Sequence, residues 1–450
     1  MKKYEKYKQS TEAVWYDSIP LNWTSTKIRD VFSERREKVS DKDYPPLSVG
    51  KMGVVPQLDT AVKTDNGDNR KLIRKGDFAI NSRSDRKGSG GMSNYDGSAS
   101  LIITVLKPHN KLNVNFYHYL LRNHYFSEEF YRNGKGLVSD LWTTKWEDMR
   151  NIYIPIPPRD EQDQIVRYLD WQVSKINHLI HGYQKQIKLL DERKCTQINQ
   201  VLVSGLNSNV NTTQSKALWM EETPCHWTQY RVKDIMYEVN ERSKEGKESH
   251  LSMSQKYGLV TDDVDIERRL LSESYVGAKV CNKDDLVLNR LKAHLGVFAL
   301  APHLGVVSPD YTVLRLRQDR VIPKYAEYLL KCNDCRKELV IRVRGIVEGF
   351  WRLYTQDLYS IYICIPGIKE QEEILEYISQ LEEKYQVVKD KLQKEVLLLK
   401  EYRTRLISDV VTGQIDVRDV VIPEYTPEED TEIDIDDTGE DMEEVAEDAE

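Results

Sequence analysis

The sequence of 450 residues lacks any run of about 18 apolar residues, the length that a membrane-spanning helix needs. Its lysine-rich first 15 residues are not followed by the apolar stretch of a signal peptide. We therefore expect a soluble protein of the cytoplasm without a membrane partner. The six cysteines are too few for a disulfide framework in so long a chain, which fits a reducing compartment.

Patterns of metal ligands are almost absent as well. Cys332 and Cys335 have the spacing of zinc ligands, but a structural zinc site usually needs four ligands, and no second pair occurs. His178 and His181 lie about one helical turn apart, without a third histidine or a carboxylate pattern. We expect no metal site.

The motifs of cofactor-binding enzymes are also missing. The sequence has no P-loop and no Gly-x-Gly-x-x-Gly after a strand. The Asn/Asp-Pro-Pro-Tyr/Phe motif of DNA amino-methyltransferases does not occur either. Pro309-Asp310 resembles the start of a nuclease motif, but no Asp/Glu-x-Lys follows it before residue 316. We expect no catalytic residues, no cofactor and no enzyme activity of this chain.

Negative charge is concentrated at one end of the chain. The formal net charge is -8, but the last 30 residues hold 15 acidic residues and no Lys or Arg, so residues 1–420 carry +7. A modestly basic body is compatible with a polyanionic partner, although this charge alone does not decide the matter. The acidic end is predicted to be disordered; it either aids solubility or contacts basic surfaces.

What the sequence does contain is an internal repeat with a shift of 204 to 209 residues. The matching positions are Trp15, Pro20 and Trp23 with Trp219, Pro224 and Trp227; Leu47-Ser48 with Leu251-Ser252; residues 75–81 with 283–289; 119–121 with 328–330; and Ile152 to Pro157, Glu161, Gln162 and Ile165 with Ile361 to Pro366, Glu370, Gln371 and Ile374. So many matches with so little drift indicate two copies of one domain.

Each copy changes its pattern at the same place. Short β-like runs, Gly-rich loops and short helical stretches are followed by about 40 residues with apolar side chains at alternating steps of 3 and 4. This predicts an α+β fold with two similar globular domains separated by two long antiparallel coiled-coil helices, related by a pseudo-two-fold axis. The alternative is that each helix lies on its own domain. The expected segments are globular domains at 1–158 and 219–367, long helices at 159–205 and 368–415, a polar linker at 206–218 and the acidic tail at 416–450.

This layout resembles the specificity subunits of type I restriction-modification systems. The resemblance rests on Pro20-x-x-Trp23 and Pro224-x-x-Trp227, on the Ile-x-Ile-x-Ile-Pro segments with their Glu-Gln pairs, and on the closing residues 406–413. It covers about residues 7–415. The tail lies outside the usual pattern, and the end of the first helix is one residue out of step with the second.

The resemblance implies a non-catalytic subunit of an enzyme complex. Its two globular domains would be target-recognition domains, each recognising one half of an interrupted site in double-stranded DNA. The implied partners are two methylation subunits, which bind S-adenosylmethionine, and, through them, ATP-dependent restriction subunits. Two alternatives for the function remain. The chain could be the specificity subunit of a methylation-only complex, or a coiled-coil adaptor that does not bind DNA.

The candidate DNA-binding residues lie in two loops that follow the same repeated strand. Arg, Lys and Asn side chains are the types that bind phosphates and the edges of guanine and adenine. The same composition would also suit a merely soluble, exposed loop. The candidates are Asn81, Arg83, Arg86, Lys87, Asn289, Arg290, Lys292 and His294.

Overall fold

The computed structural model describes residues 2–58, 67–83, 86–109, 113–136, 142–207, 209–254, 257–261, 275–345 and 351–427. The chain forms two compact units. The first unit comprises residues 1–184 and 393–450, and the second comprises residues 185–392. Among the described residues, no helix has both the length and the apolar character needed to cross a membrane.

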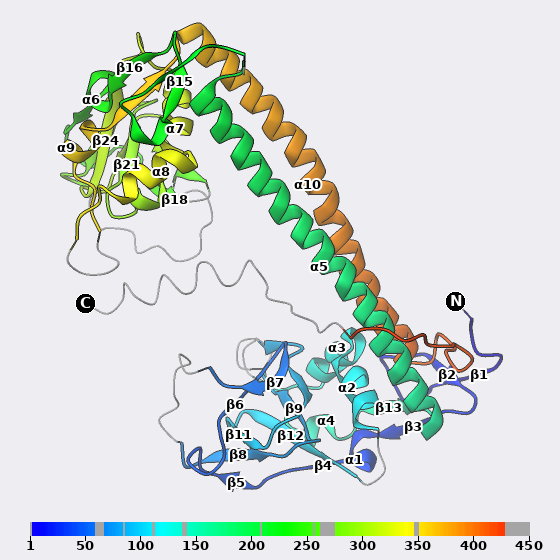
Figure 1. Ribbon diagram of the computed structural model, residues 1–450. Coiled ribbons are helices and arrows are strands. Elements are labelled where there is room, and N and C mark those ends of the chain that lie inside the picture. The colour runs from blue at the N-terminus through cyan, green and yellow to red at the C-terminus, as the bar shows by residue number, and fades with distance from the viewer. Residues whose placement is uncertain are drawn as a thin grey trace. The chain divides into compact units, whose positions relative to one another are not determined.

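The first copy of the repeat begins with a strand pair and ends with a long helix (Figure 1). Its elements are β1 (Tyr7–Gln9), β2 (Ser18–Pro20), β3 (Thr24–Lys27), α1 (Ile28–Val31), β4 (Phe32–Glu34), β5 (Lys38–Val39), β6 (Leu47–Gly50), β7 (Gly53–Pro56), β8 (Arg70–Ile73), β9 (Phe78–Asn81), β10 (Gly90–Met92), β11 (Gly97–Ala99), β12 (Ile103–Pro108), α2 (Val114–Arg122), α3 (His124–Arg132), α4 (Trp146–Met149), β13 (Tyr153–Ile156) and α5 (Arg159–Ser204).

The second copy contains the same series of elements, with few differences. They are β14 (Thr212–Gln214), η3 (Leu218–Met220), β15 (Glu222–Pro224), β16 (Thr228–Arg231), α6 (Val232–Ile235), β17 (Met236–Val239), β18 (Leu251–Ser254), β19 (Gly258–Thr261), β20 (Lys279–Cys281), β21 (Leu286–Asn289), η4 (Ala293–Leu295), β22 (Phe298–Leu300), β23 (Gly305–Val307), β24 (Tyr311–Leu316), α7 (Pro323–Lys331), α8 (Asn333–Val340), α9 (Thr355–Tyr359), β25 (Tyr362–Ile365) and α10 (Ile368–Val411).

The two copies also share their sheet topology. The strand order is β10-β9-β12-β4 in the first unit and β22-β21-β24-β17 in the second, antiparallel throughout. All four residues of β9 are buried, and the central strands β12 and β24 bury most of theirs. These strands bury both faces because helices and smaller sheets cover them, which explains their nearly continuous apolar sequences. The predicted α+β fold with two similar domains is confirmed.

The residues that define the repeat hold each domain to the start of its long helix. The indole of Trp23 donates to Glu161 at 2.9 Å, and that of Trp227 donates to Glu370 at 3.1 Å. Earlier in each copy, the indole of Trp15 donates to the Tyr153 carbonyl, as does that of Trp219 to Tyr362. A buried indole N–H needs an acceptor, so these Trp and Glu residues have structural roles.

The long helices pair with opposite directions inside each unit. In the first unit, Ile176 and Ile180 of α5 share a core with Leu406 and Val410 near the end of α10. In the second unit, Leu202 near the end of α5 shares a core with Ile374 and Ile378 near the start of α10. Polar contacts accompany this packing, namely Arg403 with Asn177, Tyr385 with Gln197, and Lys389 with Asp191. The predicted antiparallel helix pair is therefore present.

The segment that follows α10 differs from the expected tail. Val417 is buried in the core of the first unit, and Val420 and Ile422 pack against that core. The amide of Gln164 on α5 donates to the carbonyls of Val417 and Val420 at 3.0 and 2.8 Å. Residues 416–427 are thus bound along α5, because their aliphatic side chains have an apolar surface to cover. The rest of the predicted tail, 428–450, lies outside the described residues.

The segment expected to be a linker contains structure too. Thr212–Gln214 forms β14, which pairs with β15 in the same way that β1 pairs with β2. Its side chains are exposed, which is why the sequence looks like a surface loop. In both copies the two strands enclose a short apolar segment, residues 13–16 in the first and 217–220 in the second.

Each long helix ends at a glycine with a positive φ, +78° at Gly205 and +75° at Gly413. This conformation is strained for residues with a Cβ. At Gly413 a Cβ would also lie 2.4 Å from Pro20 Cδ and 3.2 Å from Trp23 Cη2. Gly413→Ala is therefore expected to destabilise the first unit by about 3 kcal/mol, as judged from the urea unfolding midpoint.

The matched control is Gly277→Ala, because Gly277 has φ +84° but nothing within 4 Å of the added Cβ. The free energy of unfolding of this variant should fall by only about 1 kcal/mol, which is the cost of a positive φ for alanine. Equal losses in the two variants would show that the contact with Pro20 and Trp23 contributes nothing.

Candidate nucleic-acid interface

The two candidate loops occupy equivalent places in their units. Residues 82–89 connect β9 to β10, and residues 290–297 connect β21 to β22. The carbonyl of Ser82 accepts from the Thr144 amide at 2.9 Å, and the carbonyl of Arg290 accepts from the Leu353 amide at 3.1 Å. Both loops are therefore fixed against a later segment of their own domain.

The two asparagines shape these loops from within. The side-chain oxygen of Asn81 accepts from the Arg83 amide, and that of Asn289 accepts from the Leu291 amide, each at 3.1 Å. Asn81 is only 6% exposed. Because a short amide side chain can bond to the backbone two residues further on, asparagine favours such turns. This contact accounts for the repeated asparagine without any contact to a base.

The basic residues of the first loop differ in their surroundings. Arg83 and Arg86 are exposed. The ammonium group of Lys87 forms an ion pair with Glu128 of α3, and this hydrogen bond is the main cause that lowers the pKa of the Glu128 carboxyl. Lys87 also lies 6.0 Å from the centre of the Tyr131 ring. A phosphate would therefore have to compete with Glu128 for Lys87.

In the second loop, the candidates are more strongly engaged. The Arg290 guanidinium donates to the Asp310 carbonyl at 2.6 Å, and its side chain is 22% exposed. His294 lies in η4 with its ring edge-on to Trp351 at 5.3 Å, and burial is the main cause that lowers its pKa, so the imidazole is neutral at pH 7. Lys292 is half-buried. The basic side chains of this loop are therefore less exposed than those of the first one.

Further basic residues lie beside each loop, and Lys135 among them was not predicted from the sequence. Lys135 forms an antiparallel β-bridge with Thr143 in the first unit, and Arg344 forms one with Arg352 at the equivalent place in the second. We call each bridged pair of segments a basic arm. The Lys135 side chain is 83% exposed although its ammonium group lies 2.7 Å from Asp148. Arg344 forms an ion pair with Asp357. The residues that connect the two sides of each arm, 137–141 and 346–350, lie outside the described residues.

A sequence signal for these arms exists. A basic residue followed by glycine and, six residues later, by tryptophan occurs as Lys135-Gly136 with Trp142 and as Arg344-Gly345 with Trp351. The shift is again 209 residues. Trp142 donates to the Tyr131 carbonyl at 2.8 Å, so it holds the first arm against α3.

The cysteine pair considered above as zinc ligands lies at the start of α8. Cys332 precedes the helix, and Cys335 is in its first turn; both are buried. Burial raises the pKa of the Cys332 thiol to about 12 and that of Cys335 well above the ordinary value, so both are protonated at pH 7. The described residues contain no group of three side chains that could hold a metal ion.

The type I restriction modification DNA specificity domain matches this chain twice, at residues 20–189 and 224–397. The chain belongs to this family. The two matches coincide with the two copies of the repeat, so this specificity subunit carries two specificity domains in tandem.

Named relatives match over long segments. The chain is 20% identical over 432 residues to a protein of Methanocaldococcus jannaschii that bears the name of the MjaX type I restriction enzyme specificity subunit, covering 89% of this chain and 95% of that one. It is also 24% identical over 276 residues to the Escherichia coli type I restriction enzyme EcoKI specificity subunit. This match covers 57% of each chain.

A solved structure shares the fold. It is described as the structural basis underlying complex assembly and conformational transition of the type I R-M system. The TM-score is 0.61 at 14% identity, and the match covers 88% of this chain and 99% of the other. The fold is thus retained although few residues are shared.

Proposed function

We propose that each specificity domain recognises one half of an interrupted DNA target, and that this chain catalyses nothing itself. Two methylation subunits, which bind S-adenosylmethionine, would act on the DNA that this subunit selects. ATP-dependent restriction subunits would join through them. The observation that carries the proposal is the duplication of one surface. Each unit has a basic arm beside an equivalent loop, which connects β9 to β10 in the first unit and β21 to β22 in the second.

We further propose that the first loop and its arm contact DNA mainly through Arg83, Arg86, Lys87 and Lys135. In the second unit Arg290, Lys292, Arg344 and Arg352 would take this role. Phosphate contacts from Arg and Lys fix the position of a protein on the duplex, whereas contacts to base edges give specificity. Asn81, Asn289 and His294 would act indirectly by shaping the loops, because their side chains already contact the protein.

Mapping of modified adenines in cells that co-express this chain with its methylation subunit tests the proposal. Two conserved blocks separated by a fixed gap are expected in the methylated motif. A single uninterrupted motif would contradict the proposal that each domain recognises one half of the target. Modification at random sites, or none that depends on this chain, would favour an adaptor that does not recognise DNA.

Neutralising Arg83, Arg86 and Lys87 together is expected to weaken DNA binding and to flatten its salt dependence. Each lost phosphate contact should reduce the slope of log K against log salt by up to about 0.9. Binding of a target duplex at several salt concentrations measures this slope. The control neutralises Lys3, Lys6 and Lys8, which removes the same charge elsewhere in the first unit.

Glu128→Gln gives a test with the opposite sign. It removes the carboxylate that pairs with Lys87 and should therefore strengthen DNA binding at low salt. An unchanged slope in the triple variant, or the same change in its control, would show that the loop does not contact DNA.

A further inference from the structure

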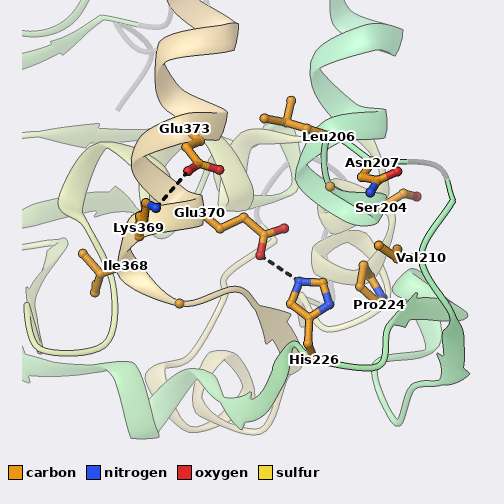
Figure 2. A pocket seen from close by; sticks show the side chains of 12 residues that line it. Ser204, Leu206, Asn207, Val210, Pro224, His226, Ile368, Lys369, Glu370 and Glu373 are labelled. Carbon is orange, nitrogen blue, oxygen red and sulfur yellow. Dashed lines mark hydrogen bonds and ion pairs between the residues drawn. The ribbon is translucent and has the colours of Figure 1, made fainter.

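A cavity of about 510 Å³ lies in the second unit where the end of α5 meets the start of α10 (Figure 2). This size falls within the range of about 300–1,000 Å³ that is usual for ligand sites. Glu370 extends into it from α10 and meets the ring of His226 at 2.8 Å. Leu206, Val210 and Pro224 contribute apolar surface, and Lys369 and Glu373 lie on the α10 side.

The equivalent place in the first unit is filled by the chain itself. There the hydroxyl of Tyr4 donates to the carboxylate of Glu161, the counterpart of Glu370. The Tyr4 ring lies edge-on to Trp23 at 5.9 Å, and the guanidinium of Arg418 lies 4.8 Å from its centre. Tyr4 is 6% exposed. A tyrosine with a neighbouring cation is therefore what this repeated site binds in the first unit.

The second copy of the repeat supplies no such side chain. The repeat shift of 204 places a serine at 208 and an asparagine at 211, where the first copy has Tyr4 and Tyr7. Among the described residues, Glu370 accepts hydrogen bonds from two donors, Trp227 and His226. Glu161 accepts from three, because Tyr4 adds to Trp23 and Asn22. The carboxylate of Glu370 thus has spare acceptor capacity.

The helix surface next to the cavity shows the same difference. In the first unit Gln164 is covered by the backbone of residues 417–420, whereas its counterpart Glu373 is exposed. Tyr168 is 7% exposed, and its counterpart Tyr377 is 37% exposed. Glu370, Glu372, Glu373 and Glu376 make this end of α10 acidic. A segment that covers it should therefore carry positive charge.

We propose that the cavity of the second unit binds an extended, basic segment of a partner chain that inserts a tyrosine against Glu370. The tyrosine hydroxyl donates to the carboxylate, its ring packs beside Trp227, and basic side chains of the segment meet Glu373 and Glu376. This site is separate from the loops that are proposed to contact DNA, and it does not depend on that proposal.

A synthetic peptide of this chain's own residues 2–8 is a suitable probe, because it carries Tyr4 and four of its seven residues are lysines. Its binding to the full-length protein can be measured by calorimetry. A variant peptide with Tyr4→Phe should bind about tenfold more weakly, since it loses a hydrogen bond to a charged acceptor. Glu370→Gln in the protein should weaken the binding of the original peptide to a similar extent.

Glu373→Lys provides a second protein variant that leaves the Trp227–Glu370 hydrogen bond intact. Its carboxylate forms an exposed ion pair with Lys369 at 4.0 Å, so folding should be unaffected while peptide binding falls about tenfold. The matched control is Glu372→Lys, which changes the same charge at an exposed position outside the cavity lining and should alter binding by no more than about twofold.

Three results would overturn the proposal. One is the absence of peptide binding at millimolar concentration. Another is unchanged binding in both Glu370→Gln and Glu373→Lys. The third is binding that is lost in Glu161→Gln but kept in Glu370→Gln, because the peptide would then be exchanging with the chain's own N-terminal segment in the first unit.

Discussion

Exchanging residues 20–158 for the corresponding domain of a relative is expected to change one half of the methylated DNA motif and to leave the other half unchanged. The physical reason is that each specificity domain has its own cores and its own loop between equivalent strands. Sequencing of modified adenines, in cells that also make the methylation subunit, measures both halves at once.

The structure sets a condition on the exchange. The incoming domain must keep tryptophan at position 23, because its indole donates to Glu161 on the helix that is retained. The reciprocal exchange of residues 224–367, with Trp227 kept for Glu370, is the control and should change the other half. If either exchange altered both halves, the two domains would not recognise DNA independently.

Gln371→Ala is expected to destabilise the second unit by about 3 to 5 kcal/mol. Gln371 is fully buried, and its amide donates to the carbonyls of Pro366 and Arg320, both at 2.9 Å. Its oxygen accepts from the Ile322 amide at 2.9 Å. The substitution removes three hydrogen bonds and leaves three backbone groups, among them the buried carbonyl of Pro366, without these partners. Urea unfolding followed by tryptophan fluorescence measures the loss.

The same substitution at the equivalent position of the first unit is the matched control. Gln162 donates to the Pro157 carbonyl at 2.9 Å, and its oxygen has no hydrogen-bond partner among the described residues. Gln162→Ala should therefore cost only about 1 to 2 kcal/mol. Equal losses at the two positions would mean that the contacts with Arg320 and Ile322 contribute nothing to stability.

Most of the fold could be predicted because its signals are local or repeated. The apolar steps of 3 and 4 predicted both long helices, and the repeat predicted that the strands of one copy would have counterparts in the other. The strand β14 was not predicted, since Thr212, Thr213 and Gln214 are polar and their pairing with Glu222–Pro224 fixes the backbone without burying side chains.

The assignment of the eight candidate residues to DNA contacts stays a prediction. The sequence pointed to two loops that are equivalent in the structure, but it did not show that the side-chain oxygens of Asn81 and Asn289 bond to the loop backbone. Nor did the sequence place Lys135 beside the first loop. An exposed basic side chain and a basic side chain held by a carboxylate have the same sequence appearance, so the pairing of Lys87 with Glu128, 41 residues away, could not be foreseen.

By itself, the sequence determined that the chain has two copies of one α+β domain, each followed by a long amphipathic helix, and that no familiar catalytic motif is present. Periodicity and self-similarity carry this information because they depend on residues close in sequence or on direct repetition. Only the tertiary structure decided that Trp23 and Trp227 donate hydrogen bonds to glutamates at the starts of the long helices. It also decided that Tyr4 fills a site whose counterpart in the second unit is a cavity. The physical reason is that these contacts join residues more than 130 positions apart, where hydrogen-bond geometry and packing, rather than local pattern, select the partners.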